Sequence, residues 1–142
     1  MELSVFLKNN VLPPLEEELT LSERFRDGEG KPAIFRLRGI TEEQSAALRR
    51  SSLRRSDSGE PRFDWERYLK KLAVACVTEP DLRSEALQAS WGVLGEEALL
   101  EKMLTAGEFA RLLEAAQRVC GFGSFAERKD QLKKASAGET AN

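Results

Sequence analysis

A helix signal near the C-terminal end is the feature that most constrains the fold of this chain. Thr105 and Glu108 have the spacing of a capping box, in which the hydroxyl accepts a backbone N–H and the carboxylate reaches back to the first residue. Gly121 supplies the left-handed residue that commonly ends a helix. Between these signals, apolar residues fall on one helical face, at Phe109, Leu112, Leu113, Ala116, Val119 and Cys120. Such a helix must pack against its own core or against a partner.

A second helix is predicted between Asp64, a favourable N-cap residue, and Pro80, which a helix rarely reaches. Its apolar stripe is almost uninterrupted and comprises Trp65, Tyr68, Leu69, Leu72, Ala73, Cys76 and Val77. Burial of each large apolar side chain stabilises a fold by roughly 1.5–3 kcal/mol, so we expect this helix to be the centre of the core.

Shorter helices are predicted on both sides of this central helix. The capping-box pattern Thr41–Gln44 opens one of them, and Leu3, Phe6 and Leu7 have the spacing of another. After the central helix, Asp81 or Ser84 is expected to cap a helix that ends near Gly92. A further apolar segment runs from Gly95 to Leu104 and completes a bundle of about five helices.

A β-hairpin is predicted before the helices. Leu19–Arg26 and Ala33–Arg38 alternate between apolar and polar residues, and Asp27–Gly30 has the composition of a turn. The acidic run Glu16–Glu18 is expected to be a solvated segment that leads into the first strand. A lone hairpin is marginally stable, so its apolar face should pack on helices. The expected fold class is therefore α+β, mainly α, with an N-terminal β-hairpin packed on a small helical bundle.

The length of 142 residues fits one domain. Residues 1–125 are predicted to form it, with a mobile basic loop at residues 51–62 (Ser51–Arg62) that contains glycine and proline. Residues 126–142 are predicted to be a charged, disordered tail.

Composition and motifs argue against several classes of function. The formal net charge of −2 creates no field that favours nucleic acid or an anionic membrane. No apolar run has the length of a membrane span, and Met1–Asn10 lacks the features of a signal peptide, so we expect a cytoplasmic protein. The chain has no histidine and no nucleotide-binding or zinc-protease motif. Cys76 and Cys120 are expected to be buried thiols, because no CxxC motif accompanies them. No catalytic residues, cofactor or metal are predicted.

The basic cluster at Arg49–Arg55 leaves one alternative open. It has the charge to bind nucleic acid or an acidic partner, as in a small regulatory adaptor. Acidic residues follow the cluster closely and no aromatic residues interleave with it, which favours a solvated helix end over a nucleic-acid site.

Several sequence blocks hold small and aromatic residues at fixed offsets that helical periodicity does not demand, and the most specific are YLKKLAVACVTEPDL, LQASWGVLG and MLTAGEFARL. Read together, the blocks closely resemble the XkdN-like phage tail assembly chaperones of tailed phages and prophages. The resembling blocks lie at Phe6–Asn10, Ser22–Gln44, Phe63–Leu82, Ala86–Leu113 and Val119–Phe122. The basic loop and the segment after Phe122 lie outside them.

The resemblance implies a chaperone that binds the tape-measure protein, keeps it soluble and promotes assembly of the tail tube around it. It also implies the bacterial cytoplasm as the site of action, absence from the mature virion, and the tail tube protein as a second partner, while self-association stays open. A tape-measure chain exposes apolar helical stripes, which an apolar groove can cover. The residues predicted to line such a groove are Leu100, Met103, Leu104, Phe109, Leu112 and Leu113; the alternative for each is a place in the core.

Overall fold

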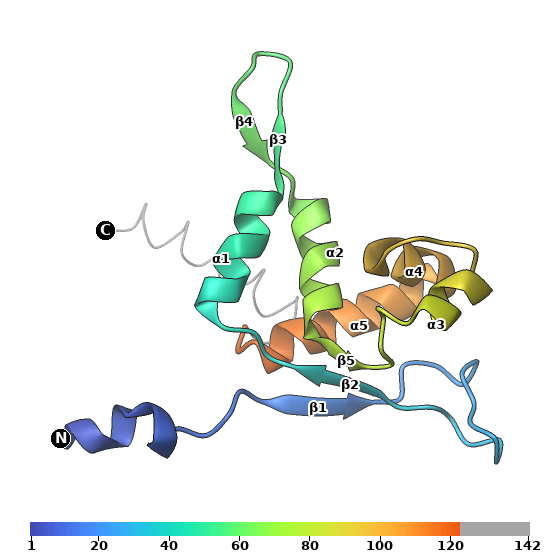
Figure 1. The fold of residues 1–142 in the computed structure, drawn as a ribbon, viewed down its shortest axis with the longest axis horizontal. Coiled ribbons are helices and arrows are strands. Elements are labelled where there is room, and N and C mark those ends of the chain that lie inside the picture. The colour runs from blue at the N-terminus through green and yellow to red at the C-terminus, as the bar shows by residue number, and fades with distance from the viewer. Residues whose placement is uncertain (123–142) are drawn as a thin grey trace, which may run out of the picture.

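The computed structural model describes residues 1–122, so the predicted tail lies outside the described residues. The helices are α1 (Glu42–Ser51), α2 (Trp65–Cys76), α3 (Glu85–Ser90), α4 (Glu96–Met103) and α5 (Ala106–Val119), preceded by the 3-10 turns η1 (Leu3–Phe6) and η2 (Lys8–Asn10). The strands are β1 (Glu16–Leu19), β2 (Phe35–Arg38), β3 (Leu53–Arg55), β4 (Pro61–Phe63) and β5 (Val77–Glu79). This arrangement confirms the predicted α+β, mainly α class (Figure 1).

The main sheet has three antiparallel strands in the order β1-β2-β5. An antiparallel pair is present, but the predicted first strand, Leu19–Arg26, is wrong: β1 ends at Leu19, and of the later residues only Arg26 pairs, in an isolated bridge with Pro32. The second predicted strand, Ala33–Arg38, is present at Phe35–Arg38. Glu16 pairs with Arg38 in the register, and Leu19 pairs with Phe35. The acidic run is therefore a strand and not a solvated leading segment. Its carboxylates lie opposite arginines, and Glu18 Oε1 is 3.1 Å from Arg36 Nη2. Strand β5 was not predicted, since Val77 continues the apolar stripe of α2.

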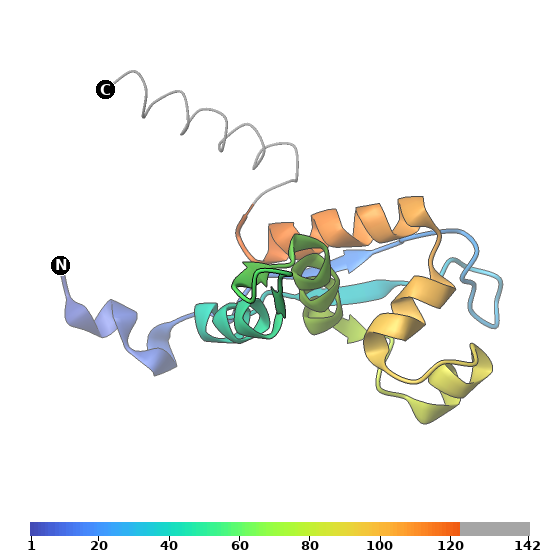
Figure 2. The ribbon, with the colours of Figure 1, turned by 90° about the horizontal axis from the view of Figure 1, so that it is seen from above.

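The core lies between α2, α5 and the sheet. Seen from above, α5 runs alongside β1 and β2 (Figure 2), and it also packs against α2. Both predicted capping boxes are present, at Thr41 with Gln44 and at Thr105 with Glu108. Asp64 caps α2 as predicted. The buried apolar side chains are Leu21, Phe35, Leu37, Tyr68, Leu72, Ala73, Cys76, Leu82, Leu99, Leu100, Met103, Leu104, Leu112, Ala115, Ala116 and Val119.

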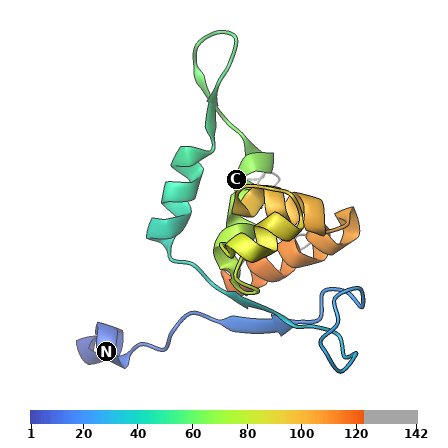
Figure 3. The same ribbon diagram turned by 45° about the vertical axis from the view of Figure 1, so that its right-hand side comes forward.

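A second β-hairpin stands where a mobile loop was predicted. Leu53 lies opposite Phe63 in this hairpin, and Arg55 lies opposite Pro61. Backbone hydrogen bonds close both of its ends: Asp64 N donates to Ser52 O (2.8 Å) and Ser56 N donates to Glu60 O (3.1 Å). The sequence did not reveal these strands because each has three residues, too few for an alternating pattern. The hairpin projects from one end of the molecule (Figures 1 and 3).

The first fifteen residues extend away from the opposite end, beside the main sheet (Figure 1). We call Met1–Leu15 the N-terminal arm. Two 3-10 turns, η1 and η2, replace the single short helix predicted here; extended Leu7 separates them, and none of their residues is buried. The arm joins the sheet at Leu15, whose carbonyl accepts a hydrogen bond from Gly39 N (3.0 Å).

Candidate partner-binding surfaces

Four of the six residues predicted to line a partner groove belong to the core. Leu100, Met103, Leu104 and Leu112 expose 2%, 5%, 8% and 0% of their surface. They come from the buried sides of α4 and α5 and the short connection between these helices. A partner therefore reaches these four side chains only if the core opens.

The other two predicted residues, Phe109 and Leu113, are half-buried on α5. They are one turn apart on the same side of the helix. Phe109 packs against the core cluster with part of its ring. Both side chains are within reach of a partner in the folded state.

The N-terminal arm carries most of the uncovered apolar surface. In residues 1–122, eight of the twelve exposed large apolar side chains lie in it: Met1, Leu3, Val5, Phe6, Leu7, Val11, Leu12 and Leu15. Isolated exposed apolar residues are ordinary, but a concentration of this kind marks an interaction site. Helical periodicity identified apolar residues in the arm. It did not reveal that the rest of the described chain, up to residue 122, leaves them exposed. The signal available in the sequence was Pro13–Pro14, which separates these residues from the rest of the fold.

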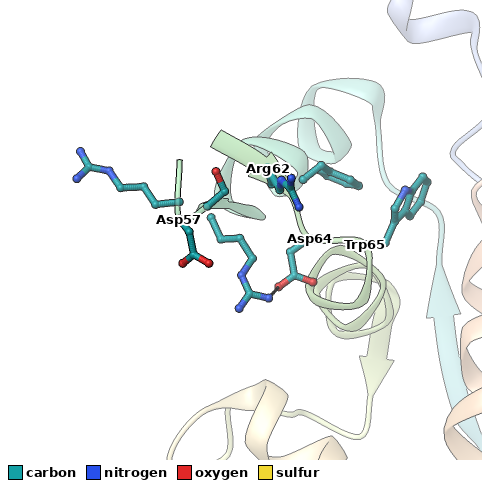
Figure 4. A pocket seen from close by; sticks show the side chains of 8 residues that line it. Asp57, Arg62, Asp64 and Trp65 are labelled. Carbon is teal, nitrogen blue, oxygen red and sulfur yellow. Dashed lines mark hydrogen bonds and ion pairs between the residues drawn. The ribbon is translucent and has the colours of Figure 1, made fainter. Parts of the chain in front are cut away.

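A second surface lies at the base of the hairpin formed by β3 and β4. A hollow of about 440 Å³ is lined by Arg54, Arg55, Ser56, Asp57, Arg62, Phe63, Asp64 and Trp65 (Figure 4). The Trp65 ring is 55% exposed and meets Phe63 edge-on, with 5.1 Å between ring centroids. This hollow combines an exposed aromatic ring with three arginines. The predicted basic cluster is thus divided, because Arg49 lies on α1 and binds Glu42, whereas Arg54 and Arg55 lie on β3.

A charged brace ties the long connection between β1 and β2 to the start of α5. Arg24 donates from Nε to Glu108 Oε2 (2.9 Å) and from Nη2 to Glu108 Oε1 (2.5 Å). The same guanidinium donates to Met103 O (2.9 Å). Hydrogen bonding by Arg24 lowers the pKa of the buried Glu108 carboxyl well below its usual range. The sequence identified Glu108 as a cap but not its partner, which is 84 positions away.

We expect Glu108→Gln to remove part of the acid sensitivity of folding. The pKa of Glu108 is lower in the folded chain than the value of about 4.3 in an unfolded chain. Its carboxylate therefore stabilises the fold above pH 4.3, and this contribution is lost as the pH falls toward the folded-state pKa. Urea unfolding of both proteins between pH 7 and pH 2 should show the stability difference shrinking below about pH 4.3.

The glutamine variant is a matched test because the capping box at Thr41 already uses Gln44 in the equivalent position. The cap is retained and the charge is removed. A stability difference that stays constant with pH would show that the Arg24–Glu108 pair contributes nothing through its charge.

The two cysteines meet where α2 and α5 end. Cys76 Sγ and Cys120 Sγ are 3.5 Å apart, and both thiols are free. Cys76 is buried, whereas Cys120 is half-buried. Hydrogen bonding with Cys120, together with burial, raises the pKa of the Cys76 thiol. The pair thus contributes apolar packing between the two central helices.

Within residues 1–122, no cluster of three potential metal-ligating side chains occurs. Over the same residues, no helix combines the length and hydrophobicity needed to cross a membrane. The features that stand out in this part of the chain are the arm and the hairpin hollow, both of which are suited to contact with other macromolecules.

Comparison with known proteins assigns the chain to a class. Residues 3–133 match the phage XkdN-like tail assembly chaperone proteins, and the chain belongs to this family.

The chain is also similar to YqbN of Bacillus subtilis (strain 168), a protein described as uncharacterized. The two are 25% identical over 138 residues, which span 94% of this chain and 93% of YqbN. The crystal structure of the protein YqbN superposes with a TM-score of 0.75 and 24% identity, covering 86% of this chain and 98% of that one. This likeness supports the fold described above.

Proposed function

We propose that the chain binds the tape-measure protein of a phage tail, keeps it soluble and promotes assembly of the tail tube around it. Binding and tail assembly take place in the cytoplasm of the bacterial host, and the chaperone is absent from the finished virion. Membership in the tail assembly chaperone family supports a role in building the tail. We expect the tail tube protein to bind as a second partner after the chaperone has bound the tape-measure protein.

The observation that carries the proposal is the uncovered apolar surface of the N-terminal arm. Leu3, Phe6 and Leu7 are exposed by 76%, 63% and 53%; Leu3 and Phe6 are three residues apart in the 3-10 turn η1, and Leu7 follows it in an extended conformation. An apolar helix of the client can pack against such a surface, as in helix-in-groove recognition. Phe109 and Leu113 are a second candidate contact, since they are reachable without opening the core.

Co-expression with the tape-measure protein encoded nearby tests this proposal. The wild-type chain should keep the client in the soluble fraction and co-purify with it at moderate salt. Leu3→Asp/Phe6→Asp should raise the client Kd about a hundred-fold or more, because two apolar side chains each lose roughly 1.5–3 kcal/mol of burial. Leu94→Asp is the matched control, since Leu94 is 93% exposed and lies outside the arm.

Two outcomes would contradict the proposal at different levels. If the wild-type chain neither solubilises nor retains the tape-measure protein, the client assignment is wrong. If the arm variant retains the client as well as the Leu94→Asp control does, the client is bound elsewhere. Binding through apolar contacts should also change little with salt, whereas binding of nucleic acid by Arg49–Arg55 would weaken steeply.

A further inference from the structure

Two surfaces at opposite ends of the molecule have complementary chemistry. The first, which we call the hairpin surface, consists of five residues that line one hollow and of Leu53, which lies opposite one of them in the register; the five are Arg54, Arg55, Arg62, Phe63 and Trp65. The second, which we call the proline segment, is Leu12–Glu18, with the sequence LPPLEEE. The hairpin and the segment that leads into β1 lie at opposite ends of the molecule in two views (Figures 1 and 3).

The hairpin surface carries cations that the fold does not neutralise. Arg54 and Arg62 are directly opposite each other in the register, and like charges in that position destabilise a strand pair. Arg54 is 3.3 Å from Asp64, whereas Arg55 and Arg62 form no ion pair with any residue of the described part, 1–122. An anionic partner would relieve this repulsion.

The aromatic half of the hairpin surface is also uncovered. Trp65 is 55% exposed, and Leu53, which lies opposite Phe63, is 49% exposed. Tryptophan and arginine are the residues most enriched among those that dominate binding energy at protein interfaces. A two-stranded hairpin is only marginally stable by itself, so a partner that covers these side chains would also stabilise the strands.

The proline segment presents the opposite pattern. Leu12 and Pro13 each precede a proline, which restricts them to extended conformations, so the segment is largely pre-ordered as a polyproline II strand. Proline-rich strands of this kind dock on aromatic side chains at low entropic cost. Leu12 and Leu15 are 86% and 66% exposed, and three glutamates follow them at once.

Two of the three glutamates remain available to a partner, whereas Arg118 of α5 holds Glu17 through two hydrogen bonds. Glu16 and Glu18 retain 70% and 58% of their side-chain exposure, although they face Arg38 and Arg36 of the same sheet. Exposed ion pairs of this type contribute little, so these carboxylates can bind additional cations at small cost. Asp57 and Asp64 lie among the arginines of the hairpin surface (Figure 4). A segment with two separate carboxylates can avoid these aspartates, whereas a continuous phosphate backbone cannot, so the surface favours a protein segment over nucleic acid.

We propose that the proline segment of one copy docks on the hairpin surface of a second copy. Leu12, Pro13 and Leu15 pack against Trp65 and Leu53 of the other chain, and Glu16 and Glu18 face its arginines. Since Leu15 is held to Gly39, the segment cannot swing to its own hairpin at the far end. The contact is heterologous, so each copy keeps one free surface and repeated contacts form an open chain or a ring.

Sedimentation velocity of the chain alone, over a range of concentrations, tests this contact without the client. The wild type should form species larger than a dimer as concentration rises. Leu12→Asp/Leu15→Asp and Arg55→Glu/Arg62→Glu should each raise the concentration for half-association about ten-fold or more. Lys102→Glu, an exposed charge change on α4, is the matched control and should behave as the wild type.

A mixing experiment distinguishes this geometry from a symmetric dimer. The Leu12→Asp/Leu15→Asp chain keeps a working hairpin surface, and the Arg55→Glu/Arg62→Glu chain keeps a working proline segment. At a concentration at which each variant alone is monomeric, an equimolar mixture should form a 1:1 heterodimer that grows no further. This heterodimer also shows that both variants are folded.

Other outcomes would overturn the proposal. A wild-type chain that stays monomeric at every concentration would exclude it, and so would association that neither double variant weakens. Variants that remain monomeric when mixed would also exclude it, if circular dichroism shows that both are folded. If the wild type instead binds a short oligonucleotide, and the Arg55→Glu/Arg62→Glu variant does not, the hairpin surface binds nucleic acid.

Discussion

Leu112→Ala is expected to lower the free energy of unfolding by about 2–5 kcal/mol. Leu112 exposes none of its surface and lies in the middle of α5, where the helix faces the core cluster. Removing its isobutyl group leaves a cavity that surrounding side chains fill only in part, so both the transfer free energy and packing contacts are lost. Urea unfolding followed by tryptophan fluorescence measures the change.

The matched control is Leu94→Ala, because Leu94 is 93% exposed and should change stability by less than about 0.5 kcal/mol. The experiment also separates the two interpretations of α5 that the sequence leaves open. If Leu112→Ala left stability unchanged and weakened binding of the tape-measure protein, Leu112 would line a groove and not the core.

Gly39→Ala is the second substitution expected to have a large effect. A Cβ atom at Gly39 would lie 2.2 Å from Val119 O and 3.1 Å from Val119 C, both backbone atoms at the end of α5. Backbone cannot move aside as a flexible side chain can, so the clash must displace either the end of β2 or the end of the helix. Overpacking of this kind costs about 1–3 kcal/mol.

Gly28→Ala provides the comparison within the same chain. A Cβ at Gly28 meets nothing within 4 Å, and the residue does not require a left-handed backbone. Thermal unfolding should place the Gly39→Ala transition well below that of the wild type and leave Gly28→Ala unchanged or slightly raised. Equal midpoints for the two variants would mean that the approach of Gly39 to Val119 is not a close one in solution.

Local signals in the sequence were sufficient for most helix boundaries. Thr41, Asp64 and Thr105 each cap the helix predicted for them, because a cap depends on residues within one turn. Gly121 adopts the left-handed conformation expected at a helix end, with φ of 87°. Hydrophobic periodicity also identified α2 as the central core helix, and it is buried at Tyr68, Leu72, Ala73 and Cys76.

Features that depend on distant residues could not be predicted in the same way. Strand β1 was missed because Glu16–Glu18 form a favourable strand only once arginines are opposite them. Gln117 is polar, yet it is buried on α5, where its side chain donates to Leu113 O (3.4 Å).

The candidate site was the least predictable part, because an apolar helical face has the same sequence pattern whether it is buried in the core or exposed to solvent. Leu112 and Phe6 both lie on regular apolar stripes, yet one is fully buried and the other is 63% exposed. Only the arrangement of the whole chain decides which stripe finds a partner within the molecule. For this reason the groove was predicted on α4 and α5, whereas the uncovered apolar surface lies in the arm.

The connection between the N-terminal arm and β1 determines how the fold resists a mechanical force applied along the arm. The chain runs from Leu15 directly into β1, and Arg118 of α5 holds Glu17 through two hydrogen bonds of 3.1 and 2.9 Å. Ladder hydrogen bonds lie across the strand direction, so a force along the arm loads all of them together, in shear, and does not peel them one by one. A growing assembly that exerts force on the arm would thus be resisted by β1 and its sheet. The arm itself stays free to change its conformation.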